Sequence, residues 1–348
     1  MELVEPPLPE ATLIGPDLRD VVDRFRPLDA LGVPAGEQRV IYADQNAADG
    51  GDGTEERPFT RLSDALAEAG GEPATILLAP GRYEGPIEVR NSLTIMGAGT
   101  ERSIIEAGEF RTILTAQDQG EATVVLGWLR LQGGSQAVEI DGLRGLFAFN
   151  VSIRDAIEQA VGMTRVNTAA FLRSEILGRR AGDMPLVSAK ASGLALFKSI
   201  IGRHQGPGLW MTHLDSDGDR CAGNPVCPFS GFLFAEDLLV DDVAGHGLDL
   251  AYAAFGLHRI RIRRVAALEG RAAVGLHLLQ TFGRIWGDGQ VADVEGICVQ
   301  TESARGRVLD LEMTGCTLGG LDVRRASLDE GIVQLPGASG DPVADGWF

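Results

Sequence analysis

Gly247-Leu-Asp-Leu250 is one copy of a four-residue unit that recurs along the chain, in which glycine precedes an aliphatic residue, any residue and a second aliphatic residue. Further copies begin at Gly193, Gly275, Gly296 and Gly320, and the last four copies are 28, 21 and 24 residues apart in turn. This spacing matches one coil of a solenoid. In a strand, the two aliphatic side chains point inward and the middle one outward. The repeat therefore predicts stacked parallel strands with one outward row: Asp249, His277, Cys298 and Asp322.

A second alignment supports the same coil length. Residues 236–244 match residues 258–266 at a constant offset of 22, with aliphatic residues over aliphatic residues. Because neighbouring coils lie about 4.8 Å apart, this offset stacks acids on arginines. We expect ion pairs between Asp237 and Arg259, Asp241 and Arg263, and Asp242 and Arg264.

The N-terminal region has a different pattern. The spacing of Phe59, Leu62, Leu66 and Ala69 predicts an amphipathic helix over 59–69, which Gly70 and Gly71 end. The predicted organisation has four parts: a leader with a short helix (1–40), a cap containing helix 59–69 (41–74), a parallel β-helix with a loop insertion at 213–230 (75–335), and a tail (336–348).

Three motifs in this region resemble the opening of pectin-lyase-like proteins. They are Asp52-Gly-Thr-Glu-Glu-Arg-Pro-Phe59, Ile76-Leu-Leu-Ala-Pro-Gly-Arg-Tyr83 and Leu93-Thr-Ile-Met-Gly-Ala-Gly99. The resemblance implies an all-β, right-handed parallel β-helix solenoid, with the helix capping its N-terminal end. It implies no specific enzyme family, because this superfamily includes lyases, esterases, hydrolases, epimerases and proteins without known chemistry.

Composition excludes several classes of partner. The 348-residue chain carries a formal net charge of −18, which argues against nucleic acid and anionic membranes because both need a positive protein surface. No run of about 18 apolar residues predicts a membrane span. Residues 1–40 lack a basic segment followed by an apolar run. We expect a secreted or cell-surface protein whose signal peptide has been removed from this sequence.

Four residues are candidates for catalysis: Asp242, His246, Asp249 and His277. Asp241-Asp242, Gly245-His-Gly247 and Arg261-Ile-Arg263 resemble motifs of polygalacturonase-type hydrolases. The arrangement departs from that family, because only two residues separate Asp242 from Gly245. Inverting hydrolysis needs two carboxyls about 6.5–9.5 Å apart, which adjacent strand residues do not provide. A charge ladder between coils explains the two aspartates without catalysis.

The outward row suggests a different chemistry. A carboxylate at Asp249 would orient the imidazole of His277 for use as a general base. A solvated face without function is the alternative. Substrate binding is predicted at three arginines, whose guanidinium groups match the geometry of sugar carboxylates: Arg259, Arg261 and Arg263.

The insertion at 213–230 contains aspartates at alternating positions, a spacing that suits calcium: Asp215, Asp217 and Asp219. It resembles the short calcium loops of thrombospondin type-3 repeats, and calcium is the candidate cofactor. A plain acidic turn is the alternative, and no organic cofactor is expected. Cys221 and Cys227 would close a disulfide, which needs an oxidising compartment. Cys298 and Cys316 differ in their offsets from the coil glycines, so we expect them to be free.

These observations predict a monomeric extracellular protein that binds a polysaccharide or cell-surface glycan, with or without catalysis. Two alternatives stay open. One is a polysaccharide-degrading hydrolase or lyase with a divergent site, and the other is a structural or adhesion solenoid. Whether the protein is an enzyme is not decided by the sequence.

Overall fold

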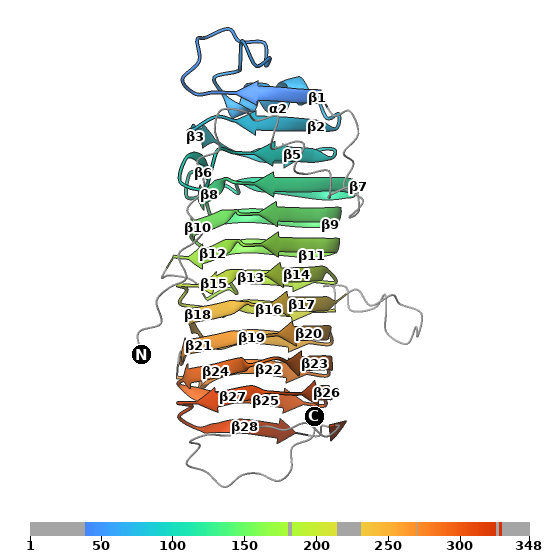
Figure 1. Ribbon diagram of the computed structural model, residues 1–348, viewed down its shortest axis with the longest axis vertical. Helices are drawn as coiled ribbons and strands as arrows, with labels where there is room; N and C mark the ends of the chain where they lie inside the picture. The colour runs from blue at the N-terminus through green and yellow to red at the C-terminus, as the bar shows by residue number, and fades with distance from the viewer. Residues whose placement is uncertain (1–38, 180–182, 214–230, 269, 325–326, 329–348) are drawn as a thin grey trace.

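The structure, a computed structural model, describes residues 39–179, 183–213, 231–268, 270–324 and 327–328. Parallel strands stack coil upon coil along one axis (Figure 1). Every pairing between named strands is parallel, as in β18 with β21 and β19 with β22. The predicted all-β parallel β-helix is therefore confirmed.

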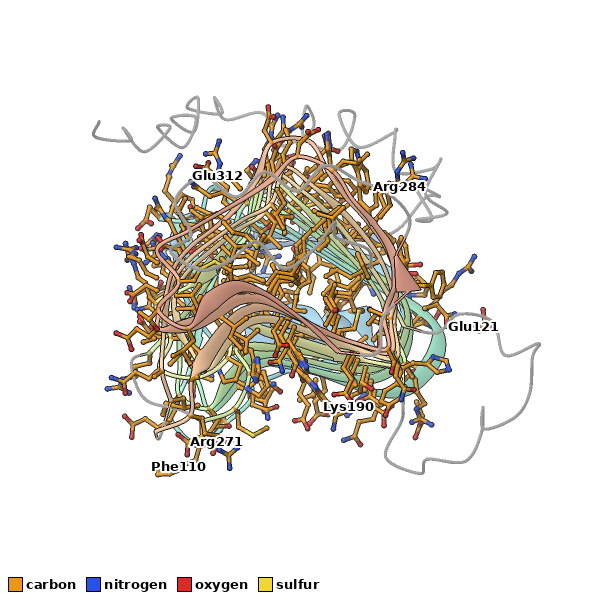
Figure 2. All side chains as sticks on the ribbon, turned by 90° about the horizontal axis from the view of Figure 1, so that it is seen from below. Phe110, Glu121, Lys190, Arg271, Arg284 and Glu312 are labelled. Atoms are coloured by element: carbon orange, nitrogen blue, oxygen red, sulfur yellow. A yellow bond between two sulfur atoms is a disulfide. The ribbon has the colours of Figure 1, made fainter. Side chains whose placement is uncertain are left out.

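Each coil contributes strands to three faces, which enclose the core in a roughly triangular cross-section (Figure 2). Face 1 contains β4 (Ile87–Val89), the first halves of β7 (Leu114–Gly127), β9 (Gln136–Phe149) and β11 (Gln159–Leu172), β13 (Val187–Lys190), β16 (Leu209–Thr212), β19 (His246–Ala251), β22 (Ala273–Leu279), β25 (Gly296–Glu302) and β28 (Gly319–Arg324).

Face 2 continues from face 1 around a corner of the coil. It contains β1 (Arg39–Ala43), β2 (Ala74–Leu78), β5 (Leu93–Met96), the second halves of β7, β9 and β11, β14 (Gly193–Phe197), β17 (Phe232–Glu236), β20 (Ala254–His258), β23 (Phe282–Trp286), β26 (Arg305–Val308) and β29 (Ser327–Leu328).

Face 3 is a separate ten-stranded sheet. It contains β3 (Gly81–Glu84), β6 (Ser103–Ala107), β8 (Arg130–Gly133), β10 (Ser152–Ala156), β12 (Glu175–Gly178), β15 (Ile200–Gly202), β18 (Leu239–Ala244), β21 (Arg261–Ala266), β24 (Gly289–Val294) and β27 (Leu311–Thr314).

The core consists of aliphatic side chains stacked between coils. On face 1, Leu248 lies opposite Leu276 and Leu276 opposite Val299, and all three are buried. Burying one such side chain stabilises the fold by about 1.5–3 kcal/mol. Because each coil contacts only its neighbours, the same column repeats along the whole solenoid.

The capping helix is α2 (Leu62–Ala69), which begins three residues later than predicted. Phe59 forms a β-bridge with Ala43 and donates its backbone N–H to the Tyr42 carbonyl at 2.9 Å, so it is extended and not helical. The helix buries Leu62 and Ala65 and packs against β1, β2 and β3, at the N-terminal end of the solenoid (Figure 1). It ends at Gly70, whose φ of 63° is left-handed.

The predicted repeat register is wrong at two of its five copies. Gly193 lies on face 2, where it pairs with Phe232 of β17. Gly296 lies opposite Ala273, which places Cys298 and not Gly296 beside Gly275. The glycine position of the repeat thus forms an inward column at a corner of the coil, and Cys298 occupies one level of it.

The expectation that Cys298 and Cys316 are free is also wrong. They form a disulfide with 5.6 Å between their Cα atoms, and no cysteine of the described chain is free. The error follows from the register: Cys298 faces inward in the glycine column and is fully buried. From there it reaches Cys316, which lies between β27 and β28.

Candidate functional site

Asp249 and His277 form a hydrogen-bonded pair on the outside of face 1. They lie opposite one another on β19 and β22, and the leucines on either side of each point into the core. His277 Nδ1 is 2.8 Å from Asp249 Oδ1, and the two side chains are only 18% and 20% exposed. The carboxylate therefore fixes the orientation of the imidazole in a partly desolvated position.

His246 joins this pair, although it is three residues before Asp249. A regular strand would place these two side chains on opposite faces. Gly247 prevents this, because it and Leu248 both face the interior and a Cβ on Gly247 would lie 2.6 Å from Ile262 Cγ2. The strand therefore bends, and the His246 ring centroid lies 5.3 Å from that of His277.

The environment of His246 disfavours the charged form of its imidazole. Burial lowers the pKa of His246, Asp249 opposes this effect, and the neighbouring His277 lowers the pKa further. His246 Nδ1 is buried without a hydrogen-bond partner among the described residues. One ligand atom from each of His246, Asp249 and His277 lies within 4.8 Å of the other two. The structure thus brings together two imidazoles and one carboxylate.

The fourth predicted catalytic residue, Asp242, is not part of this group. It lies on β18 in face 3, with a left-handed φ of 58°, while the other three lie on face 1.

The predicted outward row of face 1 is wrong at one position, because Gln300 and not Cys298 lies opposite His277. Trp210 lies opposite Asp249 on the other side, and Asp322 follows Gln300.

Ion pairs of the predicted charge ladder are present on face 3 and in the turns that lead from face 2 to face 3. The offset of 22 is confirmed, with Asp241 opposite Arg263. Arg259 donates to both Asp237 oxygens, at 2.6 and 2.9 Å, and this raises the pKa of the guanidinium. Arg264 also donates to Asp241, at 2.6 Å from Nε, and does not pair with Asp242 as predicted.

Two of the three arginines predicted to bind substrate are therefore already neutralised. Arg259 pairs with Asp237 and Glu236, and Arg263 pairs with Asp241. Of these three arginines, Arg261 is the one that is exposed and has no ion pair with another described residue. Their use in binding a polysaccharide stays a prediction that these contacts disfavour.

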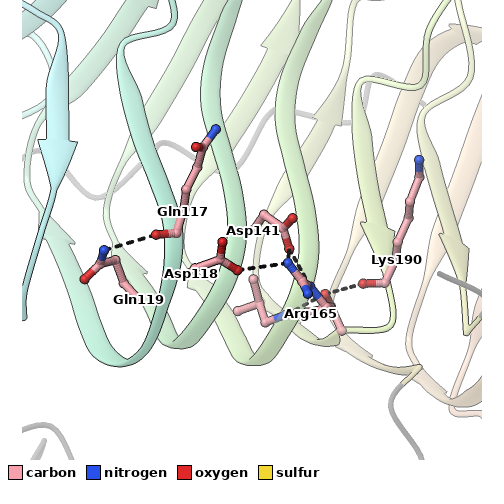
Figure 3. Close-up of polar contacts among 8 residues, drawn as sticks. Gln117, Asp118, Gln119, Asp141, Arg165 and Lys190 are labelled. Carbon is pink, nitrogen blue, oxygen red and sulfur yellow. Dashed lines mark hydrogen bonds and ion pairs between the residues drawn. The ribbon is translucent and has the colours of Figure 1, made fainter. Parts of the chain in front are cut away.

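Ion pairs between an arginine and acids on neighbouring coils also occur at the corner between faces 1 and 2. Arg165 on β11 donates to Asp141 on β9 at 2.7 Å and to Asp118 on β7 at 3.2 Å, so one guanidinium spans three coils (Figure 3). Exposed pairs of this kind contribute little to stability. Stacked acids and arginines are thus a general feature of this solenoid and do not by themselves mark a site.

A second candidate site, which the sequence analysis missed, lies on face 2. We call it the aromatic surface, defined by Phe232 and Phe234 of β17 and Phe282 and Trp286 of β23. The Phe234 and Trp286 rings are 6.2 Å apart and meet over Gly256 of the intervening β20. An open hollow of about 480 Å³ lies among these residues. The signal available in the sequence was the even spacing of the aromatic residues within each strand, two residues apart in β17 and four apart in β23.

Two arginines extend the aromatic surface. Arg284 and Arg307 lie opposite one another on β23 and β26, and the Arg284 guanidinium is 5.9 Å from the Trp286 ring centroid. Within the described ranges, neither arginine has an ion pair with a carboxylate. In a protein of net charge −18, this surface thus presents two adjacent cations that no described carboxylate neutralises.

The predicted calcium ligands Asp215, Asp217 and Asp219, and the predicted Cys221–Cys227 disulfide, lie outside the described residues. The residues that flank the insertion are described. His213 follows β16 of face 1, and Gly231 precedes β17 of face 2. They are close, since a Cβ on Gly231 would lie 3.1 Å from His213 Cα. His213 and Gly231 therefore lie together at the corner between face 1 and face 2.

A comparison of folds places the chain among known structures. A pectate lyase, Pel9A, superimposes with a TM-score of 0.51 and 12% sequence identity, over 85% of this chain and 80% of the lyase. The chain therefore shares the parallel β-helix fold of this lyase. The expectation from the N-terminal motifs is thus confirmed for the fold.

Two further solved structures are similar at lower scores. The A-module of mannuronan C-5 epimerase AlgE4 from Azotobacter vinelandii gives a TM-score of 0.44 and 14% identity, over 84% of this chain and 96% of the module. Pectin methylesterase PemA from Erwinia chrysanthemi gives 0.39 and 13%, over 80% of each chain. No protein family and no curated protein matches the sequence. No helix of the described chain is long and apolar enough to cross a membrane.

Proposed function

We propose that this protein binds an acidic polysaccharide on the aromatic surface of face 2. The main observation in its support is that large apolar rings are exposed beside an unneutralised cation. Phe232 is 40% exposed and Phe282 is 47% exposed, and both line the hollow together with Arg284. Exposed apolar patches of this kind mark ligand-binding grooves. Flat rings suit the apolar faces of sugars, and guanidinium groups pair with sugar carboxylates.

The position of the aromatic surface also supports the proposal. Its rings come from two strands that are separated by one intervening strand. At a coil spacing of about 4.8 Å, the backbones of these two strands are about 9.6 Å apart. A chain of sugars can therefore cross more than one coil and contact several rings. The pectate lyase that shares the fold is named for an acidic polysaccharide, which favours the same class of ligand.

The test is binding of a purified panel of glycans, with polygalacturonate and alginate as acidic members and a neutral glucan for comparison. Trp286→Ala and Phe282→Ala should each weaken acidic glycan binding at least tenfold. Phe110→Ala is the matched control, because Phe110 is an aromatic residue that is 95% exposed outside the aromatic surface. Arg284→Gln should reduce the preference for acidic over neutral glycans. Equal binding by all four variants would contradict the proposal.

Polysaccharide cleavage is a second candidate function, favoured by one observation. The 2.8 Å contact between Asp249 and His277 is the arrangement that supports an imidazole as a general base. Release of reducing ends or unsaturated products from the same glycan panel tests it, and His277→Ala should abolish the release. A protein that neither binds nor cleaves any member of the panel would leave the structural or adhesion solenoid as the function.

The expected location and cofactor belong to the proposal too. The Cys298–Cys316 disulfide favours an oxidising compartment, and so supports a secreted or cell-surface protein. Calcium binding by Asp215, Asp217 and Asp219 is tested by calcium titration of the wild type and of a variant with all three changed to asparagine.

A further inference from the structure

We infer that His246, Asp249 and His277 form a binding site for a divalent transition-metal ion such as Zn²⁺ on face 1. The site is separate from the aromatic surface of face 2, so this inference does not depend on glycan binding. Two imidazoles and one carboxylate are a ligand set that catalytic zinc sites use. The three side chains come from two adjacent coils and meet because of the register between β19 and β22.

The geometry requires little change to hold an ion. One ligand atom from each residue already lies within 4.8 Å of the other two. Zn–N and Zn–O bonds of about 2.0–2.2 Å would place ligand atoms about 3–3.5 Å apart, so a pair at the 4.8 Å limit must close by roughly 1.3–1.8 Å. All three side chains are partly exposed, so rotation about their side-chain bonds is available to close this gap.

The surroundings also favour a metal over a simple polar cluster. His246 Nδ1 is buried and has no hydrogen-bond partner among the described residues, which a native protein rarely leaves uncompensated. Ligation of an ion would satisfy the His246 ring. The Asp249–His277 contact already holds two of the three side chains in place, which lowers the entropic cost of binding.

The donor atoms select the type of ion. Calcium prefers six to eight oxygen ligands, and this cluster provides a single carboxylate. Imidazole nitrogen suits zinc, copper, nickel and iron. Because the protein supplies only three ligands, a tetrahedral ion would keep a fourth position for water or for a group from outside. Trp210 lies opposite Asp249 and Gln300 lies opposite His277, one on each flanking coil.

The experiment is titration of the untagged, metal-stripped full-length protein with Zn²⁺, followed by calorimetry and by measurement of bound metal after dialysis. The wild type should bind one Zn²⁺ at this site. His246→Ala, Asp249→Asn and His277→Ala should each weaken binding at least tenfold. His258→Ala is the matched control, because His258 also lies beside a carboxylate, 3.5 Å from Glu236, without a second histidine in the cluster.

Three additional measurements keep the outcome unambiguous. Circular dichroism of each metal-free variant must match the wild type, so that lost binding is not lost folding. Co²⁺ should give the visible absorption of a four-coordinate ion in the wild type and not in His277→Ala. Excess Ca²⁺ should not displace Zn²⁺. Absence of Zn²⁺ binding by the wild type, or equal binding by the wild type and all three site variants, would overturn the inference.

Discussion

Arg263 of β21 lies opposite Asp241 of β18 and donates a hydrogen bond to its carboxylate, with 3.0 Å between Nη2 and Oδ2. The contact joins residues 22 positions apart in the sequence, and it shows directly that one coil at this level contains 22 residues. Asp241 also accepts hydrogen bonds from Arg264, so a single carboxylate that is 12% exposed is shared by two guanidinium groups.

Removing the Asp241 charge should therefore destabilise the protein. We expect Asp241→Asn to lower the free energy of unfolding by about 1–3 kcal/mol, because it removes the negative charge and replaces one of the two acceptor oxygens by an NH2 donor that faces the guanidinium groups. Urea unfolding measures the change. Asp242→Asn is the control and should have little effect, because Asp242 has no ion pair in the described chain. Equal losses from the two variants would contradict the assignment of Asp241 as the shared partner.

The inward glycine column leads to a second prediction. A Cβ on Gly275 would lie 2.4 Å from Val291 Cγ1 and 2.6 Å from the Cys298 carbonyl oxygen. Gly275→Ala should destabilise the fold by about 1–3 kcal/mol through overpacking. Gly108→Ala should leave the thermal midpoint nearly unchanged, because nothing lies within 4 Å of its added Cβ. A Gly275→Ala protein as stable as the Gly108→Ala protein would show that the column is not tightly packed.

The disulfide is expected to stabilise the C-terminal coils. Closing a loop with a sequence separation of 18 residues is worth about 3 kcal/mol in the chain-entropy model. Changing both Cys298 and Cys316 to alanine should lower the unfolding free energy by about that amount. Peptide mapping under non-reducing conditions should recover the two cysteines in one linked fragment. Alkylation of both cysteines in the unreduced protein would refute the pairing.

The ion pair between Asp237 and Arg259 predicts that the stability of the fold depends on pH. The hydrogen bond from Arg259 lowers the pKa of Asp237 below its usual 3.8 in the folded protein. Its stabilising contribution is therefore present above about pH 4 and is lost as the pH falls through the folded pKa. We expect the stability difference between wild type and Asp237→Asn to shrink in that acidic range. A difference that stays constant from pH 7 to pH 2.5 would exclude this linkage.

Much of the architecture could be predicted from the sequence, because its causes are local or periodic. The spacing of Leu62, Leu66 and Ala69 predicted the capping helix, and the offset of 22 predicted the register between β18 and β21. Aliphatic residues at alternating positions are sufficient to define an inward face when each coil stacks on the next. The approach failed where coil length changed, since the offset between β22 and β25 is 23 residues and not the predicted 21, which places Cys298 where Gly296 was expected.

The candidate sites depended on tertiary structure to a greater extent. His246, Asp249 and His277 were all candidates from sequence, but their assembly required the bend at Gly247, which reverses the expected direction of the His246 side chain. The aromatic surface required the pairing of β17, β20 and β23, which brings Phe234 and Trp286 together across 52 residues of sequence. The sequence alone determined the coil and its inward face, because hydrophobic periodicity is written residue by residue. Only the tertiary structure decided which outward side chains are neighbours, because that depends on the exact length of every turn between them.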